Sequence, residues 1–329
     1  MLYDNHGRVI NYVRLAVTDR CNLRCHYCMP EQGITYLPRH ALLSYEEMER
    51  LIGILHHLGV DKLRITGGEP FVRVGMADFL ERLAKAFPTL QLHLTTNGTL
   101  TGGLVQQLKD LGIRSVNLSM DSLDPERFRT ITRRDAFGAV RRTLDELLDS
   151  GIRTRINMVV MAEHNISDIL PMVELTRHND LTVRFIEEMP FNGGGTHAGR
   201  LAWDYPAILR HLQASYPTLT KTPDPPHSTA FNYQVGGYRG QVGIIAAYTR
   251  LFCGTCNRLR ITPQGMLRTC LYDQGIFNLR DILRAGASDK ALADTIREAL
   301  KDRAKDGFEA EQRRSFQLPP TESMATIGG

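Results

Sequence analysis

Three cysteines near the N-terminus, Cys21, Cys25 and Cys28, lie in the run CNLRCHYC and carry the clearest chemical signal in this sequence. A cuboidal iron–sulfur cluster normally takes four thiolates, so three would leave one iron open to bind a small molecule. Zinc is the alternative, because it prefers four ligands and His26 could complete the set. The spacing favours a reactive cluster over zinc.

The remaining cysteines, Cys253, Cys256 and Cys270, form a second group of three. A thioredoxin-like pair would account for Cys253 and Cys256 but would leave Cys270 unexplained. Two separate sets of three thiolates suggest two clusters, although the second set by itself is also compatible with zinc. Disulfides are not expected, because no secretory signal opens the chain.

The composition is that of a globular protein: 329 residues, of which 42% are hydrophobic and 23% charged. This length fits one large domain or a domain with an appendage. The formal charge of +4 gives little support to nucleic-acid binding, and no apolar run reaches membrane-spanning length. We expect a soluble, cytoplasmic protein without nucleic-acid or membrane partners.

Residues 10–190 alternate short strand-like runs with longer helical patterns. Ser44 and Glu47 predict a capping box at the first long helix. Alternation of this kind predicts an α/β fold with parallel strands and right-handed crossovers, either an incomplete (β/α) barrel or a doubly wound sheet. The strands are expected at 13–17, 63–66, 92–95, 115–119, 153–158 and 182–186.

Polar and apolar residues alternate along most of these strands. Arg64 lies between Leu63 and Ile65, and Asn117 lies between Val116 and Leu118. A parallel sheet covered on both faces would instead show continuous apolar runs. An antiparallel sheet with one wet face is the alternative, but the helical connections argue against it. The pattern therefore predicts a wide barrel whose polar inner face holds a large polar ligand.

Distinctive loops follow the strands, among them TDRC after the first, GGEP (67–70) after the second and TNG after the third. Functional groups in such folds gather at the carboxyl ends of parallel strands. Further along, PDPP at 223–226 marks a plausible boundary. We expect a partial barrel over 1–219 and a C-terminal α+β region with a β-ribbon over 220–329.

These motifs together resemble the radical S-adenosylmethionine (SAM) enzymes. TDRCNLRCHYCMP, LRITGGEP, LTTNG, FCGTCNRLR, the later Cys270 and the final Gly-Gly resemble, more narrowly, the GTP 3′,8-cyclase family. Members of that family are lyases that perform the first step of molybdenum-cofactor biosynthesis. The resemblance covers essentially the whole chain. It implies an incomplete (β/α)6 TIM-like barrel with a C-terminal extension that carries a second cluster.

The resemblance also implies cofactors and ligands. Each cysteine triplet would hold a 4Fe–4S cluster; the open iron of the first would bind SAM, and that of the second the guanine end of GTP. SAM-contacting positions match Tyr27, Gly68, Ser119 and Met189. GTP-contacting positions match Arg14, Arg64, Thr95, Arg155, Arg258 and Arg260. Arg184 shares the polar phase of its strand and is a further candidate, and Arg155 stands where the family usually has lysine.

The implied reaction begins when an external electron donor reduces the first cluster, which cleaves SAM to methionine and a 5′-deoxyadenosyl radical. The radical removes the C3′ hydrogen of GTP, and C3′ then joins guanine C8 to give (8S)-3′,8-cyclo-7,8-dihydroguanosine 5′-triphosphate. Arg258, Arg260 and the tail Gly328-Gly329, which would enter the barrel, are expected to assist. Cyclic pyranopterin monophosphate synthase would receive the product, and family members tend to form homodimers.

Three other readings remain open. The first is another radical SAM enzyme with an auxiliary cluster, for example one that modifies a peptide. Such an enzyme would not depend on GTP or on Arg258 and Arg260. The second is a zinc-binding interaction protein with two three-cysteine sites. The third treats Gly328-Gly329 as a ubiquitin-like conjugation terminus, which the length of the chain disfavours.

Overall fold

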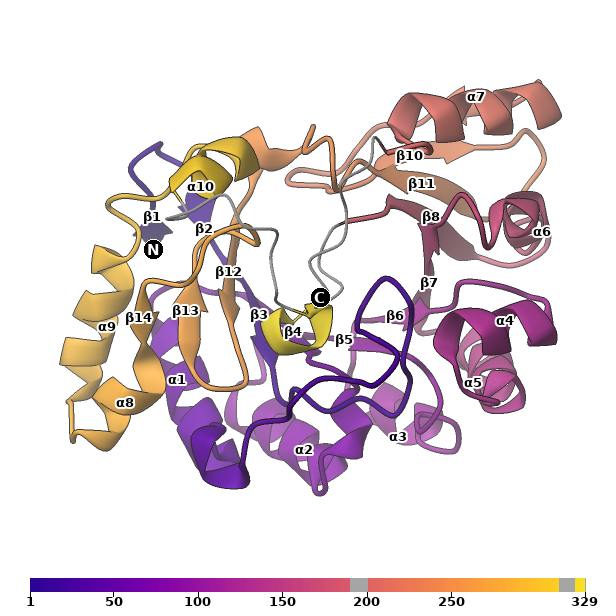
Figure 1. The fold of residues 1–329 in the computed structure, drawn as a ribbon. Coiled ribbons are helices and arrows are strands. Elements are labelled where there is room, and N and C mark those ends of the chain that lie inside the picture. The colour runs from indigo at the N-terminus through magenta and orange to yellow at the C-terminus, as the bar shows by residue number, and fades with distance from the viewer. Residues whose placement is uncertain (190–200, 314–322, 329) are drawn as a thin grey trace.

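A sheet of twelve strands forms the centre of the computed structural model, which describes residues 1–189, 201–313 and 323–328 (Figure 1). A separate two-stranded sheet pairs β1 (Leu2–Tyr3) with β2 (Val9–Ile10). In order across the large sheet, the strands are β14 (Phe277–Asn278), β13 (Met266–Arg268), β12 (Arg258–Ile261), β3 (Tyr12–Ala16), β4 (Lys62–Thr66), β5 (Gln91–Thr96), β6 (Ser115–Ser119), β7 (Arg153–Val160), β8 (Leu181–Glu187), β11 (Gln241–Ile245), β10 (Phe231–Gln234) and β9 (Thr220–Lys221).

The six strands predicted from the sequence are confirmed as β3 to β8, and all of them run parallel. The antiparallel alternative is therefore wrong. The parallel set is wider than expected, because β12 joins β3 and β11 joins β8 in parallel at the two edges. The predicted ribbon of β10 and β11 is present as an antiparallel pair. The strands that follow residue 219 thus continue the same sheet.

Helices cover the outer face of the curved sheet (Figure 1). The Ser44 hydroxyl and the Glu47 carboxylate form the predicted capping box at the start of the first. The helices are α1 (Tyr45–His57), α2 (Met76–Ala86), α3 (Val105–Asp110), α4 (Pro125–Thr132), α5 (Phe137–Ser150), α6 (Ile169–Glu174), α7 (Tyr205–Ser215), α8 (Leu279–Arg284), α9 (Asp289–Glu298), α10 (Gly307–Arg313) and α11 (Met324–Ile327). None of the helices in these described ranges is long and apolar enough to cross a bilayer.

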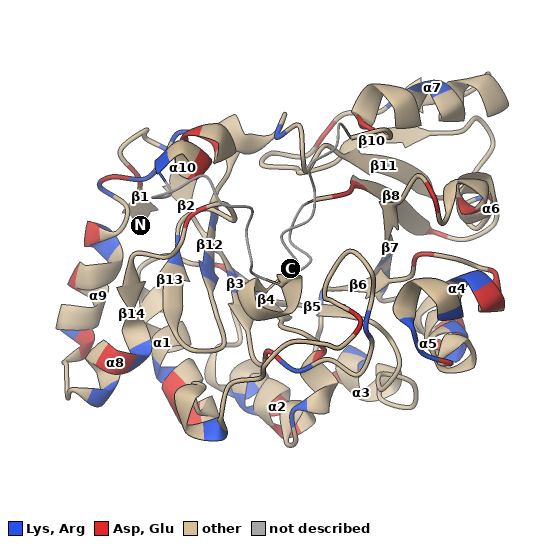
Figure 2. Ribbon diagram, viewed as in Figure 1, with Lys and Arg blue, Asp and Glu red and all other residues tan. Residues whose placement is uncertain are grey.

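The two faces of the strands have different partners. Val13, Leu15, Leu63 and Ile65 point outward and are buried in the main hydrophobic core. The intervening polar side chains point inward. Figure 2 shows both signs of charge along the outer helices and basic segments on β12 and β7. The alternation read from the sequence therefore separates an apolar outer face from a polar inner face.

Gly240 fixes the entry of β11 into the sheet. Its amide donates to Thr176 O at 2.9 Å, and a Cβ at this position would lie 2.3 Å from Leu181 O. No side chain fits beside these carbonyl groups without moving β8 and β11 apart. Since β11 completes one edge of the parallel set, glycine is required here for packing.

We expect Gly240→Ala to lower the free energy of unfolding by about 1–3 kcal/mol, because the added methyl group overpacks the β8–β11 contact. Urea unfolding followed by circular dichroism measures the change. Gly138→Ala is the matched control, since its Cβ would approach only the Arg142 guanidinium, at 3.8 Å. An equal, small effect of both substitutions would contradict this account of β11.

Candidate active site

The first cysteine triplet lies in the loop that follows β3. Cys25 O accepts from Cys28 N at 3.0 Å, and Cys21 O accepts from Arg24 Nη1 at 2.7 Å, so main-chain and side-chain hydrogen bonds shape this loop. Burial raises the pKa of the Cys21 thiol to about 11 and that of Cys28 to about 12, and raises that of Cys25 well above its usual range. Cationic iron bound to these sulfurs would favour the thiolate form that burial opposes.

The GGEP loop packs directly against this cysteine loop. Gly68 N donates to Thr18 O, and Glu69 N donates to Arg20 O, each at 2.8 Å. A Cβ on Gly68 would lie 2.2 Å from Arg20 O. Gly68 matches a SAM-contacting position, and the contact between the two loops gives a further reason for glycine here.

The second triplet lies on the turn before β12 and after β13. Burial raises the pKa of Cys253, and raises that of Cys270 to about 11. Cys256 differs, because the guanidinium groups of Arg258 and Arg303 outweigh the effect of burial and hold the pKa of its thiol at about 6. Cys256 is the one thiol of the six whose pKa is lowered; burial raises the pKa of the other five.

Strand direction places the triplets at opposite ends of the sheet. Strands β12 and β3 run parallel and start side by side. Cys256 precedes β12, whereas Cys21 follows the end of β3. Cys270 follows β13, which is antiparallel to β12 and therefore returns to the edge where Cys256 lies. All six cysteines nevertheless line one central cavity of about 440 Å³.

The geometry of the described residues gives no support to the alternative of a zinc site. In the part of the chain that the structure describes, no three His, Cys, Asp or Glu side chains gather closely enough to hold one metal ion. Zinc binds sulfur at about 2.3 Å, so its ligands must nearly touch one another. The proposed fourth ligand, His26, has its Nε2 directed to Thr130 O and accepts from Arg133 Nη2 at Nδ1.

The positions matched to SAM contacts line the same cavity as the two triplets. The Tyr27 hydroxyl donates to Asp121 Oδ2 at 3.0 Å. Gly68, Ser119 and Met189 also line the cavity. Asp121 escaped the sequence analysis; burial raises the pKa of its carboxyl group to about 7, and Val159 N donates to it.

The positions matched to GTP contacts form a basic inner wall. Strand register places Arg260, Arg14, Arg64 and His93 in one row across four neighbouring strands. The remaining candidates, Thr95, Arg155, Arg184 and Arg258, line the same cavity. Two further residues of this wall, Tyr12 and Lys62, form a second row with Arg258 and were not predicted from the sequence. Each lies two residues before an inward-facing arginine on its strand, and this spacing could have identified both from the sequence.

These cations are poorly compensated by the protein. Burial and neighbouring arginines lower the pKa of Arg260 to about 9 and that of Arg155 to about 10. Burial and the charge of Arg155 also lower the pKa of Arg184 well below its usual range. Several buried atoms on this wall have no hydrogen-bond partner in the described residues, among them Arg184 Nε, Arg258 Nε, His93 Nε2, Asn117 Oδ1 and Asn157 Oδ1. Buried polar groups are normally satisfied, so the wall fits a polar, anionic ligand.

The C-terminal segment enters this cavity. Gly328 O accepts from Arg260 Nη1 at 3.0 Å and from Arg14 Nε at 3.4 Å. At Gly328, φ is +76° and a Cβ would lie 2.9 Å from Ala16 Cβ, so glycine is needed. Ser323, which caps α11, donates to Cys28 O at 2.6 Å. Gly329, the other predicted tail residue, lies outside the described residues.

Comparisons with known proteins agree with this geometry. Residues 15–176 match the radical SAM superfamily, and residues 181–308 match the family described as Molybdenum Cofactor Synthesis C. The GTP 3′,8-cyclase of Syntrophomonas wolfei is 40% identical over 91% of this chain and 92% of its own length. The chain belongs to the GTP 3′,8-cyclase family.

Other relatives within this family are longer. The mitochondrial GTP 3′,8-cyclase of Arabidopsis thaliana is 38% identical over 92% of this chain and 77% of its own length. Molybdenum cofactor biosynthesis protein 1 of Drosophila melanogaster is 40% identical over 97% of this chain, which spans 56% of that relative. The chain spans 47% of the corresponding protein of Bos taurus. Several curated relatives are thus about twice its length.

The fold also occurs in solved structures. Streptococcus suis SuiB aligns over 96% of this chain and 76% of its own, with a TM-score of 0.62 and 14% sequence identity. At this level of identity, the likeness concerns the fold alone.

We expect Gly68→Ala to separate the GGEP loop from the cysteine loop and to release iron from the first triplet. Iron and sulfide should then fall from about eight to about four of each per chain. Gly53→Ala is the control, because its Cβ would meet only Phe87, at an ordinary 3.4 Å. Retention of all the iron by Gly68→Ala would rule out this role of the loop contact.

Tyr12 should report on the charge of the basic wall. Burial alone would raise the pKa of its phenol, but Arg64, Arg14, Lys62 and Arg258 lower it from 10.0 to about 7. Between about pH 7 and pH 10.0, the unfolded chain therefore keeps the phenol proton that the folded protein has released. The free energy of unfolding should rise with pH across this range, and this contribution should be lost as the pH falls through about 7.

Tyrosinate absorbance of the metal-free protein, compared with that of Tyr12→Phe, tests this expectation. Inorganic triphosphate should shift the titration to higher pH, because it neutralises the surrounding cations. The expectation is wrong if the wild type and Tyr12→Phe show the same tyrosinate absorbance at every pH below about 9.

Proposed function

We propose that this chain is a GTP 3′,8-cyclase. It would join ribose C3′ of GTP to guanine C8 and form (8S)-3′,8-cyclo-7,8-dihydroguanosine 5′-triphosphate, the first step of molybdenum-cofactor biosynthesis. The observation that carries the proposal is a single cavity that has a cysteine triplet at each end and unneutralised buried arginines between them. Family membership supports the same reaction.

The cysteine triplets fit the cofactors of the superfamily. Cys21, Cys25 and Cys28 would hold one 4Fe–4S cluster with SAM, and Cys253, Cys256 and Cys270 would hold the other. When bound, the first cluster and SAM supply the 5′-deoxyadenosyl radical that removes the C3′ hydrogen. Tyr27, Gly68, Ser119 and Met189 would orient SAM beside the first cluster. The cluster held by the second triplet would bind the guanine end of GTP.

The basic wall would bind the triphosphate. Arg14, Arg64, Arg258 and Arg260 come from adjacent strands, so their charges converge on one ligand. Planar guanidinium groups suit phosphate oxygens, and exclusion of water strengthens each interaction. Arg155 would supply charge at the position where the family usually has lysine. Thr95 and Arg184 complete the proposed substrate contacts.

The C-terminal segment would position two of these arginines. Gly328 O lies between Arg260 and Arg14 and holds both guanidinium groups toward the cavity. This contact would orient their remaining N–H groups for the substrate. The catalytic role expected for Gly329 stays a prediction.

The finer architecture is also part of the proposal. We regard strands β3 to β8 as an incomplete (β/α)6 barrel within residues 1–219. Residues 220–329 would form the extension that carries the second cluster and part of the substrate site. The two parts share one sheet, so the proposed boundary at residue 219 would separate their roles in the reaction and not two separately folded units.

Several partners follow from the reaction and stay predictions. An external donor must supply the electron, and cyclic pyranopterin monophosphate synthase would consume the product. The family also favours a homodimer. A cytoplasmic location and the absence of nucleic-acid and membrane partners stay predictions as well.

Anaerobic reconstitution with iron and sulfide, followed by SAM, a reductant and GTP, tests the function. We expect about eight irons per chain and formation of 5′-deoxyadenosine together with the cyclised nucleotide. Cys25→Ala should abolish SAM cleavage. Equal 5′-deoxyadenosine formation with and without GTP, and no cyclised product, would favour a different radical SAM enzyme, such as a peptide-modifying one. Zinc in place of iron would exclude both.

Replacement of both Arg258 and Arg260 by alanine should reduce GTP turnover by on the order of 10²-fold or more, since two converging cations are lost from a water-excluded site. Iron content should remain close to that of the wild type. The matched control replaces Arg129 and Arg141, whose side chains are exposed on α4 and α5. Normal GTP turnover by the Arg258/Arg260 variant would show that the substrate assignment is wrong.

A further inference from the structure

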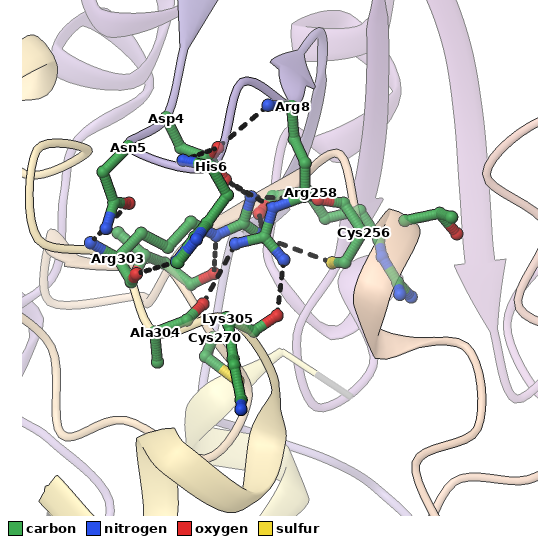
Figure 3. A network of polar contacts seen from close by, with 12 residues as sticks. Asp4, Asn5, His6, Arg8, Cys256, Arg258, Cys270, Arg303, Ala304 and Lys305 are labelled. Atoms are coloured by element: carbon green, nitrogen blue, oxygen red, sulfur yellow. Dashed lines mark hydrogen bonds and ion pairs between the residues drawn. The ribbon is translucent and has the colours of Figure 1, made fainter.

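Arg303 is an almost completely buried arginine, with a side chain that is 2% exposed. It lies after α9, far in sequence from the second cysteine triplet, yet its guanidinium group reaches Cys256. Figure 3 shows it between Asp4 on one side and Cys256 on the other. It is absent from the lining of the central cavity, so it contacts the second triplet from behind.

All five N–H groups of Arg303 have acceptors. Nη2 donates to Cys256 Sγ at 3.3 Å and to Arg258 O at 3.1 Å. Nη1 donates to Cys256 O at 2.9 Å and to Asp4 Oδ2 at 3.0 Å. Nε donates to Thr269 O at 3.1 Å, next to Cys270. A guanidinium group has five N–H donors, and all five are used here, so the position and orientation of the Arg303 side chain are fixed.

The N-terminal segment holds this arginine in place. Arg303 N donates to Asn5 Oδ1 at 3.1 Å, and His6 Nε2 contacts Arg303 O at 2.8 Å. Asp4 also accepts from Arg8 Nε at 2.6 Å. Burial opposes ionisation of Asp4, but the hydrogen bonds from Arg8 and His6 lower its pKa overall. One carboxylate therefore faces two guanidinium groups, which leaves a net positive charge beside the second triplet.

The first triplet has no comparable donor within the described residues. Asn97 Nδ2 lies 3.7 Å from Cys21 Sγ, and the Ser323 hydroxyl lies 4.0 Å from Cys28 Sγ. Both of these groups are neutral, and both contacts are longer than the one that Arg303 makes. Charge-assisted hydrogen bonds are about twice as strong as neutral ones. The two triplets are therefore built with different electrostatic surroundings.

We propose that Arg303, held by Asp4, is a positioning residue that raises the reduction potential of the second cluster through its hydrogen bond to Cys256. The inference rests on the assignment of a cluster to this triplet. Hydrogen bonds to cluster sulfurs and local net charge both set the potential. Reduction adds negative charge, which an adjacent buried cation stabilises. Arg303 itself need not touch substrate, in contrast to Arg258 and Arg260.

EPR-monitored redox titration of the holoenzyme measures the effect. A variant without the first three cysteines identifies the signal of the second cluster. Arg303→Gln should shift the midpoint potential of this cluster to more negative values. Arg303→Lys, which keeps the charge but not the five-donor geometry, should give a smaller negative shift. Asp4→Asn should shift the potential in the positive direction, because it removes the compensating negative charge.

Opposite shifts distinguish tuning from a structural role, which would lower stability and iron content in both variants. Arg127→Gln is the matched control, since Arg127 also pairs with a buried carboxylate, that of Asp168, and lies on α4. It should leave the potential unchanged.

Two results would overturn the inference: an unchanged potential in an Arg303→Gln protein that retains its iron, or a shift of the same sign in Asp4→Asn. If Arg303→Gln does not fold, Arg303→Lys and Asp4→Asn decide the question. Iron analysis of the wild type tests separately whether the second triplet holds a cluster at all. A protein with only about four irons, all lost with the first triplet, would remove the cluster assignment itself, and the inference with it.

Discussion

Buried positive charge that the protein leaves largely uncompensated is the constraint on which this structure depends. Guanidinium groups from neighbouring strands face one cavity, although burial of a cation is costly without a partner. Arg260 and Arg155 have lowered pKa values for this reason. Apolar packing between the sheet and the outer helices stabilises the fold and offsets the cost of burying these cations. A cavity of this kind is prepared for a multiply charged anion, and a nucleoside triphosphate meets that requirement.

The direction of the strands organises the remainder of the site. Because β3 to β8 are parallel, their carboxyl ends meet at one edge, where the GGEP loop packs against the loop of the first triplet. The second triplet lies at the other edge, because β12 joins β3 in parallel and β13 returns antiparallel. The sheet thus separates the two sets of thiolates and places the basic wall between them.

Both ends of the chain contribute to the site. The N-terminal Asp4 holds Arg303 behind Cys256, and the C-terminal Gly328 holds Arg260 and Arg14 inside the cavity. Two of these contacts, Asp4 with Arg303 and Arg14 with Gly328, join residues that are about three hundred positions apart, so they form only late, when both ends of the sheet are in place. The site therefore depends on the whole sheet and on both terminal segments, one behind the second triplet and the other inside the cavity.

The sequence by itself determined the six central strands, the polar inner face and the two thiolate sets, because local periodicity and spacing encode them. It could not show that β11 and β12 widen the parallel set, since strand pairing depends on contacts distant in sequence. Tyr12 and Lys62 remained unnoticed until register placed them beside Arg258, and Arg303 carried no local motif at all. Only the tertiary structure decided which charges share a cavity, because electrostatic interactions depend on distance in space and on burial.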